Sequence, residues 1–357
     1  CNEALISEEI TDHVAEIFRA EGSDAWWIRE AADLLPAGFT CPHCGGSQFD
    51  KETDIMDVWF DSGVSHAAVL EQRDELRWPA DMYLEGSDQH RGWFQSSLST
   101  SVAAYNQAPY KSVLTHGFVV DGEGKKMSKS LGNVVGPAEV ISKYGADILR
   151  MWVASADYRG DIRVSPEILG QLSDAYRRIR NTARFILGNL SDFSPETDQV
   201  PYQELAEIDR WALDQLALLS ERVKAAYRDY EFHVVFHNIH HFCAVDLGGF
   251  YLDVLKDRLY CDRPDGQKRR SAQTAMYIIL LELVKLLAPI TVFTADEIWQ
   301  HLPKPENAAA SVHLTRWESL PEHFRSPELR AKWDKLFEVR RKVTKALEDA
   351  RAEKKLG

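Results

Sequence analysis

The sequence predicts an α/β region with a parallel sheet, followed by an all-α helix bundle. Between residues 55 and 163, short apolar runs end in polar turns that contain glycine, and helical segments separate these runs. That pattern is typical of buried strands in a parallel sheet. After residue 163, apolar residues recur at helical spacing, which indicates helices packed on one another. A chain of 357 residues can bury two or three separate cores, and we divide it at 1–54, 55–163 and 164–357.

Residues 1–54 predict a small module with a helix over Ser7–Arg19 and a cysteine knuckle. Cys41 and Cys44 stand in a CxxC turn followed by two glycines, a pattern that is typical of half a zinc ribbon. Cys1 offers a third thiol, and a complete tetrahedral site needs a fourth ligand. A zinc ion held by these three cysteines and a distorted knuckle without metal both stay open, and we favour the distorted knuckle.

Polar residues follow the apolar runs of the 55–163 region. Glu85 and Asp88 come after one run, where they can accept hydrogen bonds from an ammonium group or from hydroxyls. Asp88 can instead cap a helix that begins near Gln89. His116 and Gly117 come after another run. A glycine there lets the backbone approach a ligand closely, whereas the histidine is equally well explained as a structural residue.

The most specific feature is a lysine loop, which we define as residues 121–133. It contains Lys126-Met127-Ser128-Lys129-Ser130, with glycines on both sides. Two ammonium groups three residues apart, with small hydroxyls between and after them, suit a loop that closes over a polyphosphate. The alternative is a solvated basic turn. The position of the loop, directly after a strand-like segment, favours phosphate binding.

The region after residue 163 predicts amphipathic helices. One helix face collects apolar side chains from Leu172, Tyr176, Ile179, Ala183, Ile186 and Leu190. Its other faces carry arginines that either contact RNA phosphates or form a solvated surface: Arg177, Arg178, Arg180 and Arg184. A histidine cluster follows, which we interpret as packed or facing RNA rather than as a metal site: His233, His237, His240 and His241.

Composition excludes two classes of partner. The formal net charge of −13 argues against a protein that coats DNA or RNA non-specifically, although a local basic strip on an acidic body can still bind RNA. The longest apolar stretch, Met276–Ile290, contains Glu282 and Lys285, so it is too short and too charged to cross a membrane. Five cysteines with one CxxC, and no signal peptide at the start, fit a reducing compartment. We therefore expect a cytoplasmic protein with no membrane or DNA partner.

The string KMSKS at 126–130 resembles the second ATP-binding motif of class I aminoacyl-tRNA synthetases. Two further strings carry the same resemblance, DVWFDSG at 57–63 and EGSDQHRGWF at 85–94. The residues after Glu85 resemble the isoleucyl branch of that family more than the valyl or leucyl branches. The resemblance extends through FYLD at 250–253 to LAPI at 287–290, and so covers nearly the whole chain.

This resemblance implies a Rossmann-like catalytic half, an anticodon-binding bundle, and a role for each matching residue. The implied activity converts isoleucine and ATP to isoleucyl-adenylate with release of pyrophosphate, and then transfers the isoleucyl group to tRNA(Ile), with Mg²⁺ accompanying ATP. Lys129 and Lys126 are the implied catalytic residues. The implied ATP-binding set is Lys126, Met127, Ser128, Lys129, Ser130, His116 and Gly117. The implied aminoacyl-adenylate set is Glu85, Gly86, Asp88, Gln89, Trp59 and Trp93, and the implied tRNA contacts are Arg177, Arg180 and Arg184.

The family's first ATP motif, with its paired histidines, and most of its editing domain would lie upstream of Cys1. The chain begins without methionine and ends in a charged helix, so we infer that it was cut from a longer polypeptide and expect no useful rate of adenylate formation from it alone. Two alternatives remain, a non-catalytic tRNA-binding protein with a synthetase-like body and a valyl enzyme. The intact lysine motif argues against the first, because a protein that only binds RNA has no need of it.

Overall fold

The computed structural model describes residues 1–354, with Lys129 described by its backbone alone. The side chain of Lys129 and the last three residues of the predicted 164–357 domain therefore lie outside the described residues. The chain divides into two compact units, and each is described by itself. The first unit comprises residues 1–83 and 88–112, and the second comprises residues 84–87 and 113–357. The domain boundaries at residues 54 and 163 stay predictions.

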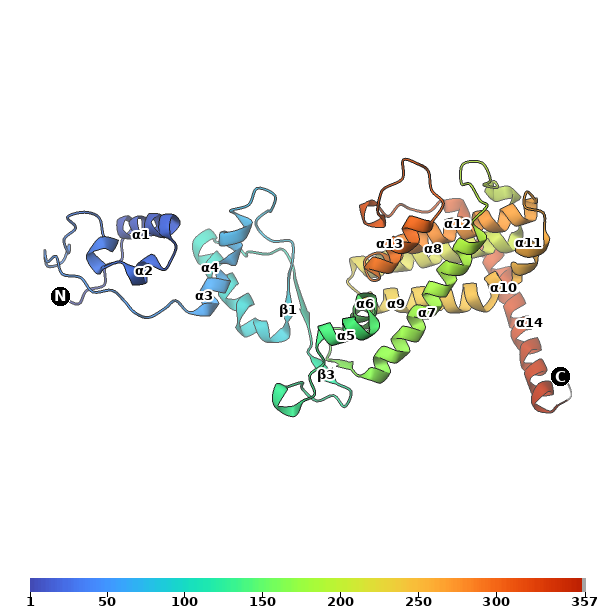
Figure 1. Ribbon diagram of the computed structural model, residues 1–357, viewed down its shortest axis with the longest axis horizontal. Coiled ribbons are helices and arrows are strands. Elements are labelled where there is room, and N and C mark those ends of the chain that lie inside the picture. Colours follow the sequence, from blue (N-terminus) through green and yellow to red (C-terminus); the bar gives the residue numbers. More distant parts are fainter. Residues whose placement is uncertain (355–357) are drawn as a thin grey trace. The chain divides into compact units, whose positions relative to one another are not determined.

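The first unit begins with the predicted helix. Ser7 caps it, because the Ser7 hydroxyl accepts a hydrogen bond from the Ile10 N–H at 3.3 Å, and the helix ends at Gly22, whose φ is +84°. Ile17 and Leu34 form part of a small core. The helical elements are α1 (Glu8–Glu21), α2 (Ala25–Ile28), η1 (Ala31–Leu34), α3 (Val58–Gly63), η2 (His66–Leu70) and α4 (Trp93–Tyr105), as Figure 1 labels them in part.

Two elements carry the chain across the boundary between the units, β1 (Tyr83–Gly86) and η3 (Ser87–Arg91). The helix expected near Gln89 begins as this short 3₁₀ turn and continues as α4. The Gln89 side-chain oxygen, rather than Asp88, accepts a hydrogen bond from the Trp93 N–H at 3.0 Å. That bond satisfies one of the free donors at the start of α4.

The remaining strands are short and form two-stranded sheets. They are β2 (Val113–His116), β3 (Val119–Asp121) and β4 (Ile162–Val164), and β1 pairs with β2. Strands β3 and β4 are parallel, with Val119 opposite Ile162 and Asp121 opposite Val164. The predicted parallel pairing is thus confirmed for β3 and β4, and the strands of the described residues form two two-stranded sheets.

Helices dominate the rest of the second unit and share one large hydrophobic core (Figure 1). The helices are α5 (Pro137–Tyr144), α6 (Ala146–Ser155), α7 (Pro166–Asn189), α8 (Glu207–Arg228), α9 (Phe232–His241), α10 (Leu252–Val254), α11 (Lys256–Cys261), α12 (Gln267–Leu287), α13 (Val292–His301) and α14 (Pro327–Ala352). A π-helix, η6 (Phe242–Tyr251), follows α9 directly, and the short 3₁₀ turns are η4 (Lys129–Leu131), η5 (Tyr202–Glu204), η7 (Val312–Leu314) and η8 (Glu322–Phe324).

Helix α7 forms as its sequence predicts. Ser165 caps it and Pro166 occupies its first turn, where a missing N–H costs nothing. The predicted apolar face is buried at Leu172, Ile179, Ala183, Ile186 and Leu190, and Tyr176 is half-buried with its hydroxyl 2.8 Å from the Thr294 hydroxyl. None of the described helices is both long and apolar enough to span a membrane.

A buried carboxylate joins four elements of the bundle. Asp209 on α8 has no exposed surface. Its two oxygens accept hydrogen bonds from the Arg258 guanidinium at 2.8 and 2.9 Å, from the Tyr251 hydroxyl at 2.8 Å and from the Ser271 hydroxyl at 2.6 Å. The charge is therefore paired and hydrogen-bonded, which is the condition for burying it.

Candidate functional site

The lysine loop leaves β3 as a tight hairpin. The Asp121 N–H donates to the Lys125 carbonyl and the Gly124 N–H donates to the Asp121 carbonyl, each at 2.9 Å. Gly124 has a φ of +84°, a conformation that glycine adopts without strain. Lys125 is ion-paired with Glu123 at 2.7 Å. Lys126 is exposed and forms no ion pair in the part of the chain that the structure describes, so its ammonium group is available to a ligand.

The middle of the loop is anchored. Met127 is half-buried and packs against the large helical core. The Ser128 hydroxyl lies 3.1 Å from the Ser130 hydroxyl and accepts from the Leu131 N–H at 3.3 Å, which orders the start of the η4 turn. The predicted ATP-binding residues of the loop therefore share one folded segment, and their roles stay predictions.

The close approach predicted for Gly117 occurs, but its neighbour is another stretch of this chain. A β-carbon on Gly117 would lie 2.4 Å from the carbonyl of Gly160. The Gly117 N–H donates to the Tyr158 carbonyl at 2.8 Å, and the His116 ring lies 2.8 Å from the Gly117 carbonyl. Glycine is required here for backbone packing, which removes the reason we gave for a ligand at this position.

In the first unit, an aromatic corner forms around Gly92. A β-carbon there would lie 2.6 Å from the Gln89 side-chain oxygen and 3.0 Å from the Trp59 ring. Trp93 is committed to packing, since it stacks on Tyr83 at 4.2 Å and its ring N–H donates to the Ser62 carbonyl at 2.9 Å. Trp59 remains 48% exposed, so part of its surface is open to a ligand.

The predicted aminoacyl-adenylate residues divide between the two units. Asp88 and Gln89 belong to the first unit with both tryptophans, whereas Glu85 and Gly86 belong to the second. Glu85 and Asp88 are exposed, Gly86 is buried, and the Gln89 amide donates to Asp88 at 3.4 Å. The sharing of one ligand by all six residues stays a prediction.

The structure brings the three predicted metal-binding cysteines together. The sulfur atoms of Cys1, Cys41 and Cys44 all lie within 4.8 Å of one another, and those of Cys1 and Cys41 are 3.7 Å apart. Sulfurs bound to one tetrahedral zinc at about 2.3 Å stand about 3.8 Å apart. The Cys44 and His43 backbone N–H groups hold the pKa of the Cys41 thiol below its ordinary value, which favours the thiolate that a metal needs. The residues therefore fit a zinc ion, and the choice between a zinc site and the distorted knuckle that we favoured from the sequence stays a prediction.

The predicted RNA-binding arginines of α7 have different surroundings. Arg177 pairs with Asp174, and Arg180 lies 3.9 Å from Glu297. Arg184 is exposed and has no ion pair among residues 1–354. Of the three, Arg184 is the freest to contact a phosphate, and the role of each stays a prediction.

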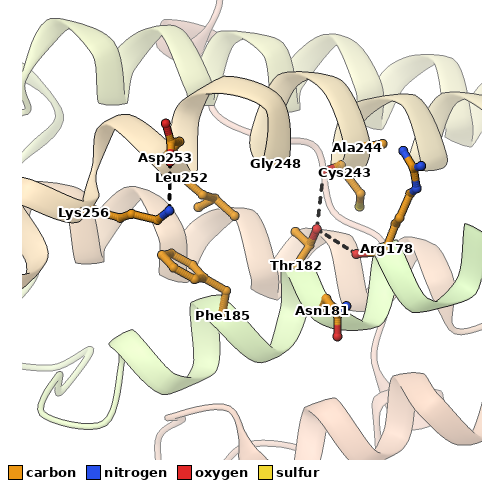
Figure 2. Close-up of a pocket in the computed structure, with 10 residues that line it drawn as sticks. All are labelled: Arg178, Asn181, Thr182, Phe185, Cys243, Ala244, Gly248, Leu252, Asp253 and Lys256. Atoms are coloured by element: carbon orange, nitrogen blue, oxygen red, sulfur yellow. Dashed lines mark hydrogen bonds and ion pairs between the residues drawn. The ribbon is translucent and has the colours of Figure 1, made fainter. Parts of the chain in front are cut away.

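A cavity of about 330 Å³ lies beside these arginines, between α7 and the segment that includes η6 and α11. Figure 2 shows Arg178 at one end and Lys256 at the other, with Phe185 and Leu252 between them. Lys256 is paired with Asp253 at 2.8 Å.

Burial and the nearby Arg178 lower the pKa of His240 on α9, so that histidine favours its neutral form. Within the described residues, the three cysteines are the group arranged to hold a metal, and the interpretation of the histidine cluster as packed or facing RNA stays a prediction.

Sequence reasoning missed Asp121 and Asn133, the two residues that fasten the ends of the lysine loop together at 2.8 Å. Both stand next to the glycines that flank the lysine motif. Their position was the available signal, since a polar residue at each end of a glycine-flanked loop can close it.

Comparison with known proteins identifies the family to which this architecture belongs. Residues 1–165 match the class I tRNA synthetases (I, L, M and V), and residues 209–357 match the anticodon-binding domain of tRNA ligase. The fold is similar to that of agnB2 LeuRS of Agrobacterium radiobacter K84 in a ternary complex with tRNA and LeuAMS. The TM-score is 0.63 at 21% identity, over 81% of this chain and 36% of that one. Mycobacterium tuberculosis methionyl-tRNA synthetase in complex with methionyl-adenylate gives 0.57 at 21% identity, over 68% and 49%. The chain belongs to the class I aminoacyl-tRNA synthetases.

Within that class, the chain corresponds to a segment of isoleucine–tRNA ligases. It is 60% identical over its whole length to the enzyme of Syntrophotalea carbinolica, and 57% identical to that of Geobacter sulfurreducens. The enzyme of Carboxydothermus hydrogenoformans is also 60% identical over the whole chain. The chain spans 38 to 39% of the length of these relatives. The family and the order of the two predicted regions, α/β and then anticodon-binding helices, are confirmed.

Proposed function

We propose that the protein carrying this chain activates isoleucine with ATP and transfers it to tRNA(Ile). The observation that carries the proposal is the lysine loop, which is anchored at Met127 and presents Lys126 without an ion-pair partner among the described residues. A surface loop without a functional role would have no need of an anchored backbone that carries an unpaired ammonium group. Identity to isoleucine–tRNA ligases supports the choice of amino acid.

The loop's part in the reaction follows from where charge moves. A carboxylate oxygen of isoleucine attacks the α-phosphorus of ATP, and the bond from that phosphorus to pyrophosphate breaks. Negative charge then collects on the departing pyrophosphate. Lys126, with Lys129, stabilises that charge, and a fixed cation does so without reorganising. Mg²⁺ bound with ATP would neutralise phosphate charge in the same step.

The remaining roles follow from the other described groups. The exposed part of Trp59 offers an apolar surface for the isoleucine side chain. The arginines of α7, Arg184 foremost, contact phosphates of tRNA. We place the reaction in the cytoplasm, because thiols gathered as a metal site persist where the solution is reducing.

A zinc ion, held by Cys1, Cys41 and Cys44 with a fourth ligand, would brace the knuckle of the first unit. We expect the full-length protein carrying this chain to retain zinc through gel filtration, and Cys41→Ser to lose most of it. The metal-to-protein ratio is measured by atomic emission, which does not depend on activity. Cys261→Ser is the matched control, because that exposed cysteine lies on α11 in the other unit. Equal zinc in both variants contradicts the site.

The test of the function is exchange of labelled pyrophosphate into ATP by the full-length protein, with isoleucine, valine and leucine offered separately. We expect the fastest exchange with isoleucine. Valine lacks one methylene and loses about 0.8 kcal/mol of apolar burial, which is about fourfold in binding. A second arm follows the attachment of labelled isoleucine to tRNA(Ile). Exchange that is fastest with valine identifies a valyl enzyme, and a folded protein that binds tRNA without any exchange supports the non-catalytic alternative.

A further inference from the structure

The two ends of the lysine loop are joined by a single side chain, that of Asn133. Its amide nitrogen donates to the Asp121 carboxylate at 2.8 Å and to the Lys126 carbonyl at 3.3 Å. Its amide oxygen accepts from the Ser128 N–H at 2.9 Å. Both donors of the amide are therefore used, and its oxygen is used as well. One residue thus holds the start of the loop and the backbone on both sides of Met127.

Asp121 is equally occupied. One carboxylate oxygen accepts from Asn133, and the other accepts from the N–H groups of Glu123 at 3.0 Å and Lys125 at 2.8 Å. Among the contacts that hold the pKa of the Asp121 carboxyl below its ordinary value, the hydrogen bond from the Asn133 amide has the largest effect. The carboxylate therefore fixes the hairpin turn with one oxygen and the far end of the loop with the other.

These contacts hold the backbone beside Lys126 without involving the Lys126 side chain. Asn133 holds the carbonyl of Lys126 and the N–H of Ser128, so it fixes the backbone from which the Lys126 side chain extends. A long, flexible side chain reaches a defined point only when its backbone is fixed. The position of the Lys126 ammonium group therefore depends on the contacts that Asn133 makes with the backbone.

We propose that Asp121 and Asn133 form a latch that positions the lysine loop for catalysis, which makes Asn133 a positioning residue of the adenylation step. This inference rests on the proposed function for its kinetic consequence. Its structural consequence, the closure of the loop, does not depend on that function, so the latch and the proposed function can fail separately.

Three variants of the full-length protein test the latch. Asn133→Ala removes all three hydrogen bonds. Asn133→Asp keeps the acceptor for Ser128 but sets a carboxylate against Asp121 and against the Lys126 carbonyl. The exchanged pair Asp121→Asn/Asn133→Asp restores one donor and one acceptor between the two side chains. Asn307→Ala is the matched control, an exposed asparagine in a surface loop.

The kinetic readout is single-turnover formation of the adenylate. Asn133→Ala should lower the rate constant about 10- to 100-fold, as expected for hydrogen bonds that involve a charged group. The amount of adenylate formed per protein and the KM for isoleucine should not change. Asn133→Asp should be slower still, and the exchanged pair should recover part of the loss. Adding Asn133→Ala to Lys126→Met should cost nothing further, because the latch acts through that lysine.

The second readout does not need activity. Trypsin cleaves after lysine, and opening the loop should speed cleavage at residues 125–129 in Asn133→Ala relative to wild type and to Asn307→Ala. An unchanged cleavage rate overturns the latch. A loss of adenylate amplitude with an unchanged rate constant also overturns it, because that pattern reports misfolded protein. If wild type forms no adenylate but cleavage still accelerates, the proposed function fails while the latch stands.

Discussion

Replacing Lys126 with methionine should lower the rate of isoleucine-dependent pyrophosphate exchange by about 100-fold or more. Methionine keeps the length of the side chain and removes its charge. The ammonium group is exposed and unpaired in the described part of the loop, so its charge is free to act on the phosphates. Removal of one preorganised group that stabilises transition-state charge typically costs about 100- to 1,000-fold. The KM for isoleucine should stay near the wild-type value, because the lysine acts on ATP.

The neighbouring lysine is the matched control. Lys125 belongs to the same turn, but its ammonium group is paired with Glu123. Lys125→Met should therefore leave exchange close to wild type, whereas Lys129→Met should behave like Lys126→Met. Equal losses from Lys125→Met and Lys126→Met would mean that the loop contributes only general positive charge, and the role assigned to Lys126 would then be withdrawn.

Replacing Asp209 with alanine should lower the free energy of unfolding of the helical bundle by about 3–5 kcal/mol, the usual cost of breaking a buried ion pair on one side. The Arg258 side chain is only 15% exposed, so its charge would be left buried without a partner. The Tyr251 and Ser271 hydroxyls would lose their acceptor as well. Thermal unfolding followed by circular dichroism should show the bundle melting at a markedly lower temperature.

The control for that variant is Asp265→Ala. Asp265 pairs with Arg263 at 2.9 Å, but both side chains are more than two thirds exposed, and such pairs contribute about 0–1 kcal/mol. Its melting temperature should match wild type. Similar shifts in the two variants would show that the Asp209 network does not hold the bundle together.

The sequence predicted those parts of the fold that depend on neighbours along the chain. The first helix, the buried face of α7 and the glycine-flanked lysine loop each follow from local patterns, and the structure contains all of them. Within the candidate site, the cysteine knuckle follows from the same kind of reasoning, because its CxxC turn is local in the sequence.

The parts that could not be predicted depend on residues far apart in the sequence. Gly117 meets Gly160, and nothing local to either glycine indicates the other. Burial of Asp209 depends on Arg258 and Ser271, which arrive on separate helices. The ten-residue π-helix η6 (Phe242–Tyr251) could not be predicted either, because apolar periodicity does not distinguish a π-helical stretch from an α-helical one.

Met127 has a consequence for how the lysine loop can move. Its half-buried side chain packs against the large core of the second unit, so the loop is anchored near its centre as well as at its ends. A loop held in this way has no single lid-like swing. The backbone on the two sides of Met127 is coupled through Asn133, which holds the Lys126 carbonyl and the Ser128 N–H. Under the proposed function, the loop would therefore meet ATP from a backbone whose centre and ends stay in place.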